Sequence, residues 1–445
     1  MVVVAVVGAG PAGLVAAKRF LEDGWDVCVF EQQGEVGGTW VYTDDIGTEE
    51  KYVHSSMYAN LKTNLTKHAM AYLDYPFPKS SPNILSQREV LEYLNSYANE
   101  FNLLPYIKFN HQILSIEPCD PNLPFTGKYN VIVEHEGTKT TITFDYVVVC
   151  NGHNSYPFTP VIPGIKNFRG RVLHCHDYRK PEAFTNQTIL IIGSGYSATD
   201  IGEQLSACAK HIHVSLKDNK YNRRSEYTNI QYHSKTKRIL QSGVLLEDGK
   251  HLDNIDTILF CTGYHYRFDF LSPQMKVNVK FKRVCDLYKH IYPVNRWHPQ
   301  YYRFFNRQGN RPTIVPTLAF IGLPMQIVPF PLFDHQVLFI RSIWSGRSHL
   351  PPVSIIKEEM KADYKKRKEV GLPPHLHHAL IQGQGAYCRE LSDIYTTSDM
   401  NPEKANPQYP KTSTGSPYSF LSYNSLIISL TVLIPTITLL YSLSK

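Results

Sequence analysis

The sequence predicts an α/β protein that is built around two parallel β-sheets. Two short glycine-rich segments support this prediction, because each follows a continuous apolar run and precedes a segment of helical character. Continuous β-branched runs are typical of strands that are buried on both faces of a parallel sheet. A strand, a glycine turn and a helix in this order form the start of a βαβ unit. We therefore expect two related units in this chain of 445 residues.

The first glycine segment is Gly8-Ala9-Gly10-Pro11-Ala12-Gly13, which follows the apolar run 2–7. In a dinucleotide-binding turn, the first glycine allows the tight turn and the second lets the backbone approach a pyrophosphate. The third glycine lets the helix pack closely on the strand, and the helix N-terminus favours the anion. Glu31 ends the next strand-like run, where a carboxylate binds ribose hydroxyls. We therefore expect an adenine dinucleotide at this segment.

The second glycine segment is Gly193-Ser194-Gly195-Tyr196-Ser197-Ala198, which follows the apolar run 188–192. Ala198 takes the place of the third glycine, a change that the contact between helix and sheet tolerates. We expect Ser197 to contact pyrophosphate or nicotinamide. For Tyr196, the same contact and a purely structural role are both open. The segment predicts a second dinucleotide, and two dinucleotides in one chain imply electron transfer between them.

The ribose position of the second unit carries a cation in place of an acid. Lys217 follows the strand-like run 211–216, and Arg223 and Arg224 come shortly afterwards. A lysine or arginine attracts a 2′-phosphate that an acid would repel, so the sequence favours NADPH over NADH. Lys217 is the first candidate for this contact and Arg223 is a weaker one. The alternative is that these residues form a solvated basic loop.

The two units form an internal repeat that predicts the domain organisation. Each unit ends in a similar strand and turn, at 145–152 and at 256–263. We therefore expect the second unit to be inserted into the first. The predicted ranges are 1–160 for the first part of the first dinucleotide-binding domain, 161–264 for the inserted NADPH-binding domain, and 265–398 for the completion of the first domain.

Residues 168–178 read FRGRVLHCHDY, which resembles the F-x-G-x-x-x-H-x-x-x-(Y/F) signature of the flavin-containing monooxygenases. The resemblance extends to VGGTW at 36–40, LKTN at 61–64 and CTGY at 261–264, and it covers the chain up to about residue 390. It implies an FAD domain split around an NADPH domain. It also implies cofactor contacts from Gly38, Thr39, Trp40, Thr63 and Asn64. A helical run at 334–343 would present its N-terminus to the flavin ring, and Gln336 on this run is a further candidate contact.

The resemblance also implies a mechanism. NADPH reduces FAD, and the reduced flavin takes up O₂ as a C4a-hydroperoxide. One oxygen atom then passes to a soft nitrogen or sulfur atom of a small amine, thiol or sulfide. From the sequence alone, Asn64 is favoured as a loop cap or turn residue. The family match reverses this, because Asn64 matches the family position beside the reactive edge of the flavin, and it is the candidate catalytic residue.

Two alternatives remain open. The first is a Baeyer–Villiger or N-hydroxylating relative. Baeyer–Villiger enzymes usually carry Trp-Pro where this chain has Tyr178-Arg179, which favours heteroatoms over ketones. The second is a membrane-tethered flavoprotein without catalysis, and the intact glycines of both segments argue against it.

Composition and residue spacing argue against several other classes of protein. The net charge of +7 is small, and no array of basic and aromatic residues indicates nucleic-acid binding. The eight cysteines contain no C-x-x-C pair, which disfavours a redox-active disulfide, and no metal-ligand spacing is present. We expect no signal peptide, because the first strand begins at once, and hence free thiols in a reducing compartment.

The C-terminal segment predicts membrane attachment. Residues 399–425 have the composition of a flexible linker, and residues 426–443 carry no charge over 18 positions. This length is near the lower limit of about 17–25 residues for a spanning helix. We expect a tail anchor in the endoplasmic reticulum membrane with the catalytic body facing the cytosol; the alternatives are a helix docked on the protein and a soluble cytoplasmic enzyme. The sequence does not decide the oligomeric state, and a homodimer is compatible with it.

Overall fold

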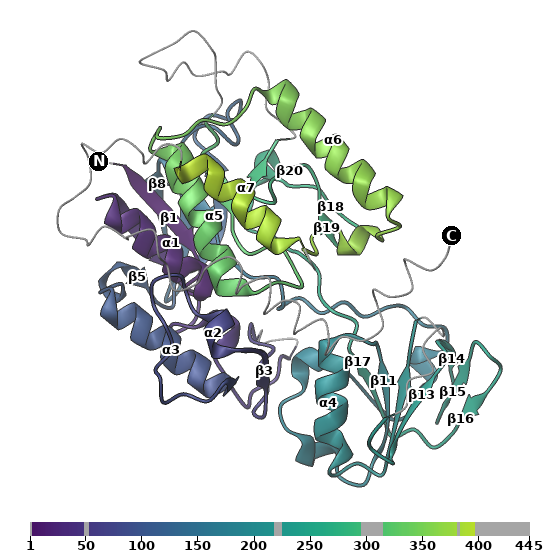
Figure 1. Ribbon diagram of the computed structural model, residues 1–445. Coiled ribbons are helices and arrows are strands. Elements are labelled where there is room, and N and C mark those ends of the chain that lie inside the picture. The colour runs from purple at the N-terminus through teal and green to yellow at the C-terminus, as the bar shows by residue number, and fades with distance from the viewer. Residues whose placement is uncertain (1, 49–52, 218–224, 295–314, 381–382, 397–445) are drawn as a thin grey trace.

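The computed structural model of the protein describes residues 2–48, 53–217, 225–294, 315–380 and 383–396 (Figure 1). Arg223 and Arg224 lie outside the described residues, as do the predicted linker at 399–425 and the predicted membrane anchor at 426–443. Within the described ranges, every helix is too short or too polar to cross a bilayer. The predicted α/β class with two Rossmann-like units is confirmed by the two parallel sheets that follow.

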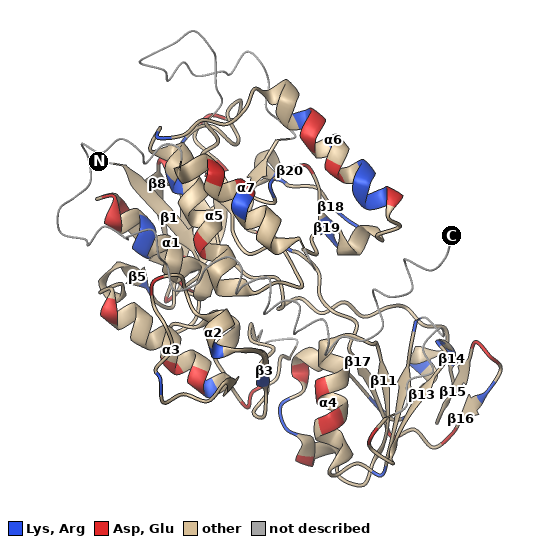
Figure 2. Cartoon of the chain, viewed as in Figure 1, with Lys and Arg blue, Asp and Glu red and all other residues tan. Residues whose placement is uncertain are grey.

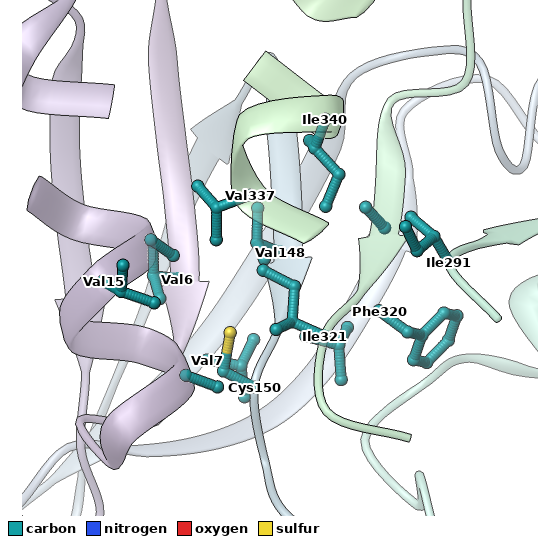
Figure 3. Close-up of a cluster of buried hydrophobic side chains, with 14 of the residues drawn as sticks. Val6, Val7, Val15, Val148, Cys150, Ile291, Phe320, Ile321, Val337 and Ile340 are labelled. Atoms are coloured by element: carbon teal, nitrogen blue, oxygen red, sulfur yellow. The ribbon is translucent and has the colours of Figure 1, made fainter. Parts of the chain in front are cut away.

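The first sheet contains five parallel strands in the order β22-β9-β1-β2-β5. Their bounds are Val3–Val7 for β1, Asp26–Phe30 for β2, Ile107–Lys108 for β5, Tyr146–Val149 for β9 and Leu318–Phe320 for β22. The helices α1 (Pro11–Glu22) and α5 (Pro329–Trp344) pack against each other and on this sheet. Figure 3 shows Val15 of α1 and Val337 of α5 in one apolar cluster with Val6 and Val148 of the sheet, and all four are fully buried.

The second sheet contains five parallel strands in the order β10-β17-β11-β12-β13. Their bounds are Arg171–His174 for β10, Thr188–Ile192 for β11, His211–Ser215 for β12, Ile230–His233 for β13 and Thr257–Phe260 for β17. Ile189 and Ile191 of β11 pack in the cluster that includes helix α4 (Tyr196–Ser206). The alternate residues Leu190 and Ile192 pack with the small antiparallel sheet β14-β15-β16. The run 188–192 is apolar throughout because both of its faces are covered.

The remaining elements cover these sheets or connect them. The helices are α2 (Lys67–Met70), α3 (Gln87–Glu100), α6 (Val353–Glu369) and α7 (Gln384–Thr396). The antiparallel strands are β3 (Lys62–Thr66), β4 (Ile84–Ser86), β6 (Gln112–Pro118), β7 (Tyr129–His135), β8 (Thr138–Phe144), β14 (Thr236–Ile239), β15 (Val244–Leu246), β16 (His251–Leu252), β18 (Val279–Lys280), β19 (Arg283–Val284), β20 (Leu287–Tyr288) and β21 (Tyr292–Pro293).

The predicted internal repeat has a structural counterpart in both sheets. Asp145 precedes β9 and accepts a hydrogen bond at 3.0 Å from the backbone N–H of Val3, which begins β1. Asp256 precedes β17 and accepts the equivalent bond at 2.8 Å from Thr188, which begins β11. After completing the second sheet, the chain returns to the first, because β22 pairs with β9. The domain boundaries at 160, 264 and 398 stay predictions.

Helix α5 begins earlier than the sequence predicts. The expected helical run is 334–343, and the helix extends from Pro329 to Trp344. The sequence pattern did not indicate this start, because the first turn contains two prolines, Pro329 and Pro331. Proline is acceptable there because the first N–H groups of a helix have no intrahelical acceptor.

Helix α6 contains the basic run 357–368, and acidic residues are interspersed along it (Figure 2). Lys365 lies 3.8 Å from Glu369, and Arg367 lies 2.7 Å from Asp363. These pairs at spacing four are typical of a solvated helix face.

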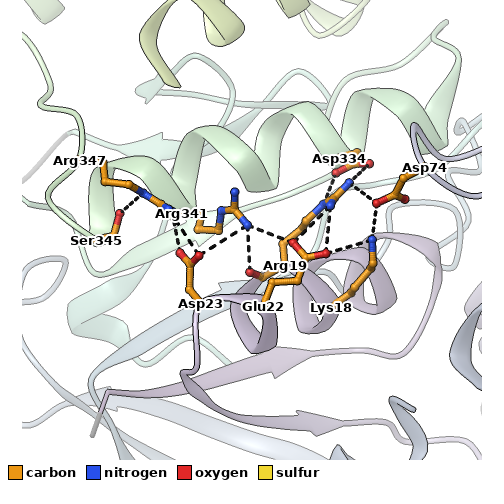
Figure 4. Close-up of polar contacts among 9 residues, drawn as sticks. All are labelled: Lys18, Arg19, Glu22, Asp23, Asp74, Asp334, Arg341, Ser345 and Arg347. Carbon is orange, nitrogen blue, oxygen red and sulfur yellow. Dashed lines mark hydrogen bonds and ion pairs between the residues drawn. The ribbon is translucent and has the colours of Figure 1, made fainter. Parts of the chain in front are cut away.

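Helices α1 and α5 are joined by charged groups as well as by apolar packing (Figure 4). Arg19 of α1 donates two hydrogen bonds of 2.8 Å to the carboxylate of Asp334 in α5. Asp334 is fully buried and Arg19 is 9% exposed. Arg19 also contacts Glu22 and Asp74, so this network binds the helix after the first glycine segment to the helix that follows β22.

We predict that Asp334→Leu destabilises the protein by about 3 kcal/mol, because it leaves the Arg19 guanidinium buried without its bidentate partner. The matched control is Arg347→Met, which removes the more exposed pair with Asp23 and should cost less than about 1 kcal/mol. Thermal unfolding followed by circular dichroism measures both. Equal, small shifts in the two variants would show that the buried pair contributes little.

Candidate active site

One cavity of about 2050 Å³ contains both glycine segments. It is lined by Val7 and Gly8 at the carboxyl end of β1, and by Ile192 and Gly193 at the carboxyl end of β11. Ligands of open α/β sheets bind outside the carboxyl ends of the strands. A single drug-sized ligand occupies a pocket of about 300–1,000 Å³, so this volume suits two dinucleotides side by side.

The first glycine segment forms a tight backbone cradle. Gly8 has a φ of +97°, and a Cβ atom on it would lie 2.9 Å from the carbonyl oxygen of Cys150. A Cβ atom on Gly13 would lie 1.8 Å from the carbonyl oxygen of Gly8. Helix α1 starts at Pro11, immediately after this turn, and its first N–H groups have no acceptor within the helix. The segment therefore has the geometry that a pyrophosphate requires, and the fold itself requires Gly8 and Gly13.

Glu31 lies directly after β2, as predicted for a ribose ligand. It is 4% exposed, and its carboxylate accepts hydrogen bonds from the N–H groups of Ala9 at 2.7 Å and Gln33 at 2.8 Å. Burial raises the pKa of the Glu31 carboxyl, and these backbone bonds oppose the rise. A carboxylate offers about four acceptor positions, so these backbone bonds leave acceptor capacity for a ribose hydroxyl.

The two glycines of the second segment have different surroundings. Gly193 has a φ of +136°, and a Cβ atom on it would lie 2.2 Å from the carbonyl oxygen of Cys261. Gly195 precedes α4 with a φ of −80°, and no atom lies within 4 Å of the position of its Cβ. The fold thus requires Gly193, whereas Gly195 keeps open space next to the helix N-terminus. A dinucleotide phosphate fits this space.

Most of the predicted contact residues face the cavity. The lining includes Gly8, Gly10, Pro11, Ala12, Glu31, Gly38, Thr39, Trp40, Asn64, Gly193, Gly195, Tyr196, Ser197 and Lys217. Gly13 and Ala198 do not line it; they lie in the first turn of α1 and α4, where the third position of each segment packs on its sheet. Arg223 lies outside the described residues, so its predicted role stays untested.

Two of the predicted cofactor contacts, Thr63 and Gln336, do not line the cavity. Thr63 donates to the carbonyl of Leu65 at 2.8 Å and accepts from the N–H of Leu85 at 3.0 Å. Gln336 is fully buried, accepts from the N–H of Gly322 at 3.0 Å and donates to the hydroxyl of Tyr387 at 2.9 Å. Both side chains use their polar groups within the protein. They therefore position the neighbouring backbone, and their predicted contacts to a cofactor stay predictions.

Asn64 faces the cavity from the middle of β3. Side chains alternate along a strand, so the buried Thr63 turns Asn64 outward. His54 lines the same cavity, and burial, with a smaller effect of His176, lowers the pKa of its imidazole to about 4. The ring is therefore neutral at neutral pH. Two uncharged polar side chains thus face the space between the glycine segments.

Sequence reasoning missed the residues that fix the two units relative to each other. Arg179 donates to the carbonyl groups of Asp45 at 3.0 Å, Ser55 at 3.3 Å and His176 at 2.6 Å. The hydroxyl of Tyr58 donates to the carboxylate of Asp200 in α4. No local pattern marks these contacts, because each joins segments that are more than 100 positions apart in the sequence, apart from the bond to His176.

Within the described residues, no group of three or more His, Cys, Asp or Glu side chains has the arrangement of a metal site. The predicted absence of a metal stays a prediction.

We predict that Gly195→Ala folds normally but binds NADP⁺ about tenfold more weakly, a loss of ~1.4 kcal/mol. The added methyl group enters open space that a phosphate needs. Gly193→Ala is the matched variant and should fail to fold stably, because its Cβ would overlap the carbonyl of Cys261. Calorimetric titration with NADP⁺ and thermal unfolding distinguish the two effects. Unchanged NADP⁺ affinity in Gly195→Ala would contradict the assignment of this segment to a phosphate.

The sequence matches the flavin-binding monooxygenase-like family over residues 2–226 and 218–404. It is 36% identical to the flavin-containing monooxygenase FMO GS-OX-like 6 of Arabidopsis thaliana over 400 residues, which cover 86% of this chain and 80% of that protein. The structure of S-allyl-L-cysteine S-oxygenase from Allium sativum superposes with a TM-score of 0.80 at 30% identity, over 98% of this chain and 94% of that one.

The structure of Tmm from Pelagibacter sp. strain HTCC7211 has a TM-score of 0.77 at 24% identity, over 97% and 90% of the two chains, and shows the shared fold. Together with the two glycine segments in one cavity, these findings show that the chain belongs to the flavin-containing monooxygenase family, whose members are FAD- and NADPH-dependent enzymes.

Proposed function

We propose that this enzyme uses NADPH, FAD and O₂ to insert one oxygen atom into a soft sulfur or nitrogen atom of small molecules, through a flavin C4a-hydroperoxide. The observation that supports this proposal best is that both glycine segments and Asn64 line one cavity. A shared cavity allows a nicotinamide and a flavin to meet. Bound FAD supplies the redox chemistry, because it accepts a hydride from NADPH and then activates O₂.

The residues of the chain provide binding and orientation in this proposal. The N–H groups at the start of α1 and α4 bind the two pyrophosphates, because the N-terminus of a helix attracts anions. Glu31 accepts hydrogen bonds from a ribose of FAD. Lys217 provides the positive charge for the 2′-phosphate of NADPH. Asn64 acts through its Nδ2–H group, a neutral donor that holds an oxygen atom in place without exchanging a proton with it.

A fixed relation between the two units is required, since the reacting rings belong to cofactors bound on different sheets. Arg179 and the pair Tyr58–Asp200 fix this relation. A proline at position 179, as in the Baeyer–Villiger relatives, could not donate these hydrogen bonds. Arg179 is therefore a positioning residue, and its contacts give a physical reason for the departure from the Trp-Pro pair. The Baeyer–Villiger alternative stays open until ketones are tested.

Sulfur compounds are the first substrates to test, because the garlic relative is named as an S-oxygenase of S-allyl-L-cysteine. The purified, FAD-loaded enzyme with NADPH and O₂ should convert a thioether to its sulfoxide and a tertiary amine to its N-oxide. A cyclic ketone should remain unchanged. Mass spectrometry with ¹⁸O₂ verifies that the oxygen atom comes from O₂. Formation of a lactone alone would favour the Baeyer–Villiger alternative, and NADPH consumption without any oxygenated product would contradict the proposal.

We predict that Asn64→Ser and Asn64→Asp keep the rate of flavin reduction by NADPH but lose most of the oxygenated product, with hydrogen peroxide released in its place. The loss follows from removal of the neutral donor beside the reacting oxygen. Lys62→Met is the control, since Lys62 lies on the same strand, is exposed and does not line the cavity. The ratio of product to NADPH consumed measures the effect. An unchanged ratio in both Asn64 variants would eliminate the role of this residue.

A homodimer is a further proposal, and size-exclusion chromatography with light scattering tests it.

We also propose that residues 426–443 attach the enzyme to the cytosolic face of the endoplasmic reticulum membrane. The uncharged C-terminal segment supports the attachment. The full chain should stay with membranes after extraction with alkaline carbonate, and a chain that ends at residue 425 should be released. Release of both forms would contradict a spanning anchor and favour the soluble alternative.

A further inference from the structure

The hairpin formed by β18 and β19 has an unfavourable turn. Val279 pairs with Val284 and Lys280 with Arg283, so the turn contains only Phe281 and Lys282. Their φ values are +52° and +58°. A two-residue turn with both residues in the left-handed region favours Asn-Gly, because a side chain there costs about 1–2 kcal/mol. Residues that break such a local rule are concentrated at functional sites.

The tip of this hairpin reaches from the first unit to the second. Val284 packs in the apolar core of the first unit, whereas Lys282 contacts the segment that follows β17 in the second sheet. The Nζ atom of Lys282 donates to the carbonyl of Thr262 at 2.9 Å and lies 4.3 Å from the centre of the Phe158 ring. Phe281 and Lys282 both line the cavity that contains the glycine segments. Phe281 is 77% exposed, an unusual state for a phenylalanine.

Three basic side chains from separate segments meet in this part of the cavity. Burial, and then the charge of Lys217, lower the pKa of Lys282. Burial, and then the charges of Lys217 and Lys282, lower the pKa of His375. All three residues line the cavity, and none forms an ion pair with a residue that the structure describes. The repulsion between Lys217 and Lys282 is relieved by a ligand with more than one negative charge.

We propose that the tip of the β18–β19 hairpin is the second half of the NADPH site. Lys282 binds the 2′-phosphate together with Lys217, and the ring of Phe281 stacks on the adenine. This inference rests on the proposed function, in which Lys217 marks the 2′-phosphate. Lysine binds phosphate as a point charge, and aromatic side chains stack on bases of any sequence. The exposed phenylalanine, and the lysine at a strained turn that forms no ion pair with a described residue, thus have one common explanation.

This assignment makes the first unit contribute to recognition of the second cofactor. A ligand held between Lys217 and Lys282 joins the two units, so NADPH stabilises their relative placement. NAD⁺ lacks the 2′-phosphate and gives no such contact to the hairpin. An alternative is that Lys282 only holds the two units together, through its hydrogen bond to the carbonyl of Thr262.

The test is calorimetric titration of the FAD-loaded full chain with NADP⁺ and with NAD⁺, which differ only in the 2′-phosphate. Lys282→Met should weaken NADP⁺ about tenfold or more, because a hydrogen bond to a charged group contributes about 1.5–3 kcal/mol. The affinity for NAD⁺ should stay within about twofold of the wild type. Lys282→Gln keeps a hydrogen-bond donor for the carbonyl of Thr262 and should show the same loss. This variant therefore distinguishes the role of the lysine charge from the role of the bond to Thr262. Phe281→Ala should weaken both nucleotides by a similar factor of about five or more.

The control is Lys280→Met, which removes the same charge from the same hairpin. Lys280 is exposed and does not line the cavity, so neither affinity should change. Equal losses for NADP⁺ and NAD⁺ in the Lys282 variants, or no loss in either, would overturn the proposal. A wild-type enzyme that binds NAD⁺ as tightly as NADP⁺ would overturn the 2′-phosphate assignment of Lys217 as well. A wild-type preference for NADP⁺ that the Lys282 variants retain would overturn only the role of the hairpin.

Discussion

Each glycine segment is held against the carbonyl group of a cysteine that directly follows the neighbouring strand, and the site depends on this contact. Gly8 approaches the carbonyl of Cys150 and Gly193 approaches that of Cys261, so closely that no side chain fits at either position. Both cysteines in turn donate their N–H groups to the last residue of the glycine-bearing strand, at 3.0 Å and 2.9 Å. The turn is therefore fixed from both sides, and the helix that follows must start at the edge of the sheet.

The placement of the cofactors follows from this constraint. Because both turns open into one cavity, each sheet offers a place for one dinucleotide at its own end, and the proposed function has the reactive ends meet between the sheets. The contacts between the two units then determine whether the nicotinamide and the flavin lie in a reactive arrangement. Arg179 and Tyr58 form these contacts through backbone carbonyls and Asp200, while the network of Arg19 and Asp334 holds the helix after the first turn in place. Chemistry at a bound flavin requires little more from the protein than position and polarity.

The sequence predicted what is local and missed what depends on distant contacts. Sequence patterns predicted the strands, the glycine turns, Glu31 and the repeat, because each depends on a few consecutive residues. Gln336 and Thr63, predicted as cofactor contacts, form hydrogen bonds with Gly322 and Leu85, partners that no local pattern indicates, and their cofactor contacts stay predictions. Two prolines concealed the start of α5. The basic group formed by Lys217, Lys282 and His375 was equally invisible, because tertiary packing brings three separate segments together.

The most direct test of this account is stopped-flow absorbance of the wild-type enzyme. The FAD-loaded protein is reduced anaerobically with NADPH and then mixed with oxygenated buffer, with and without a thioether. The account predicts a long-lived flavin hydroperoxide spectrum that decays faster as the thioether concentration rises. Immediate return to oxidised flavin with release of hydrogen peroxide, and with no effect of the thioether, would contradict it and indicate an NADPH oxidase.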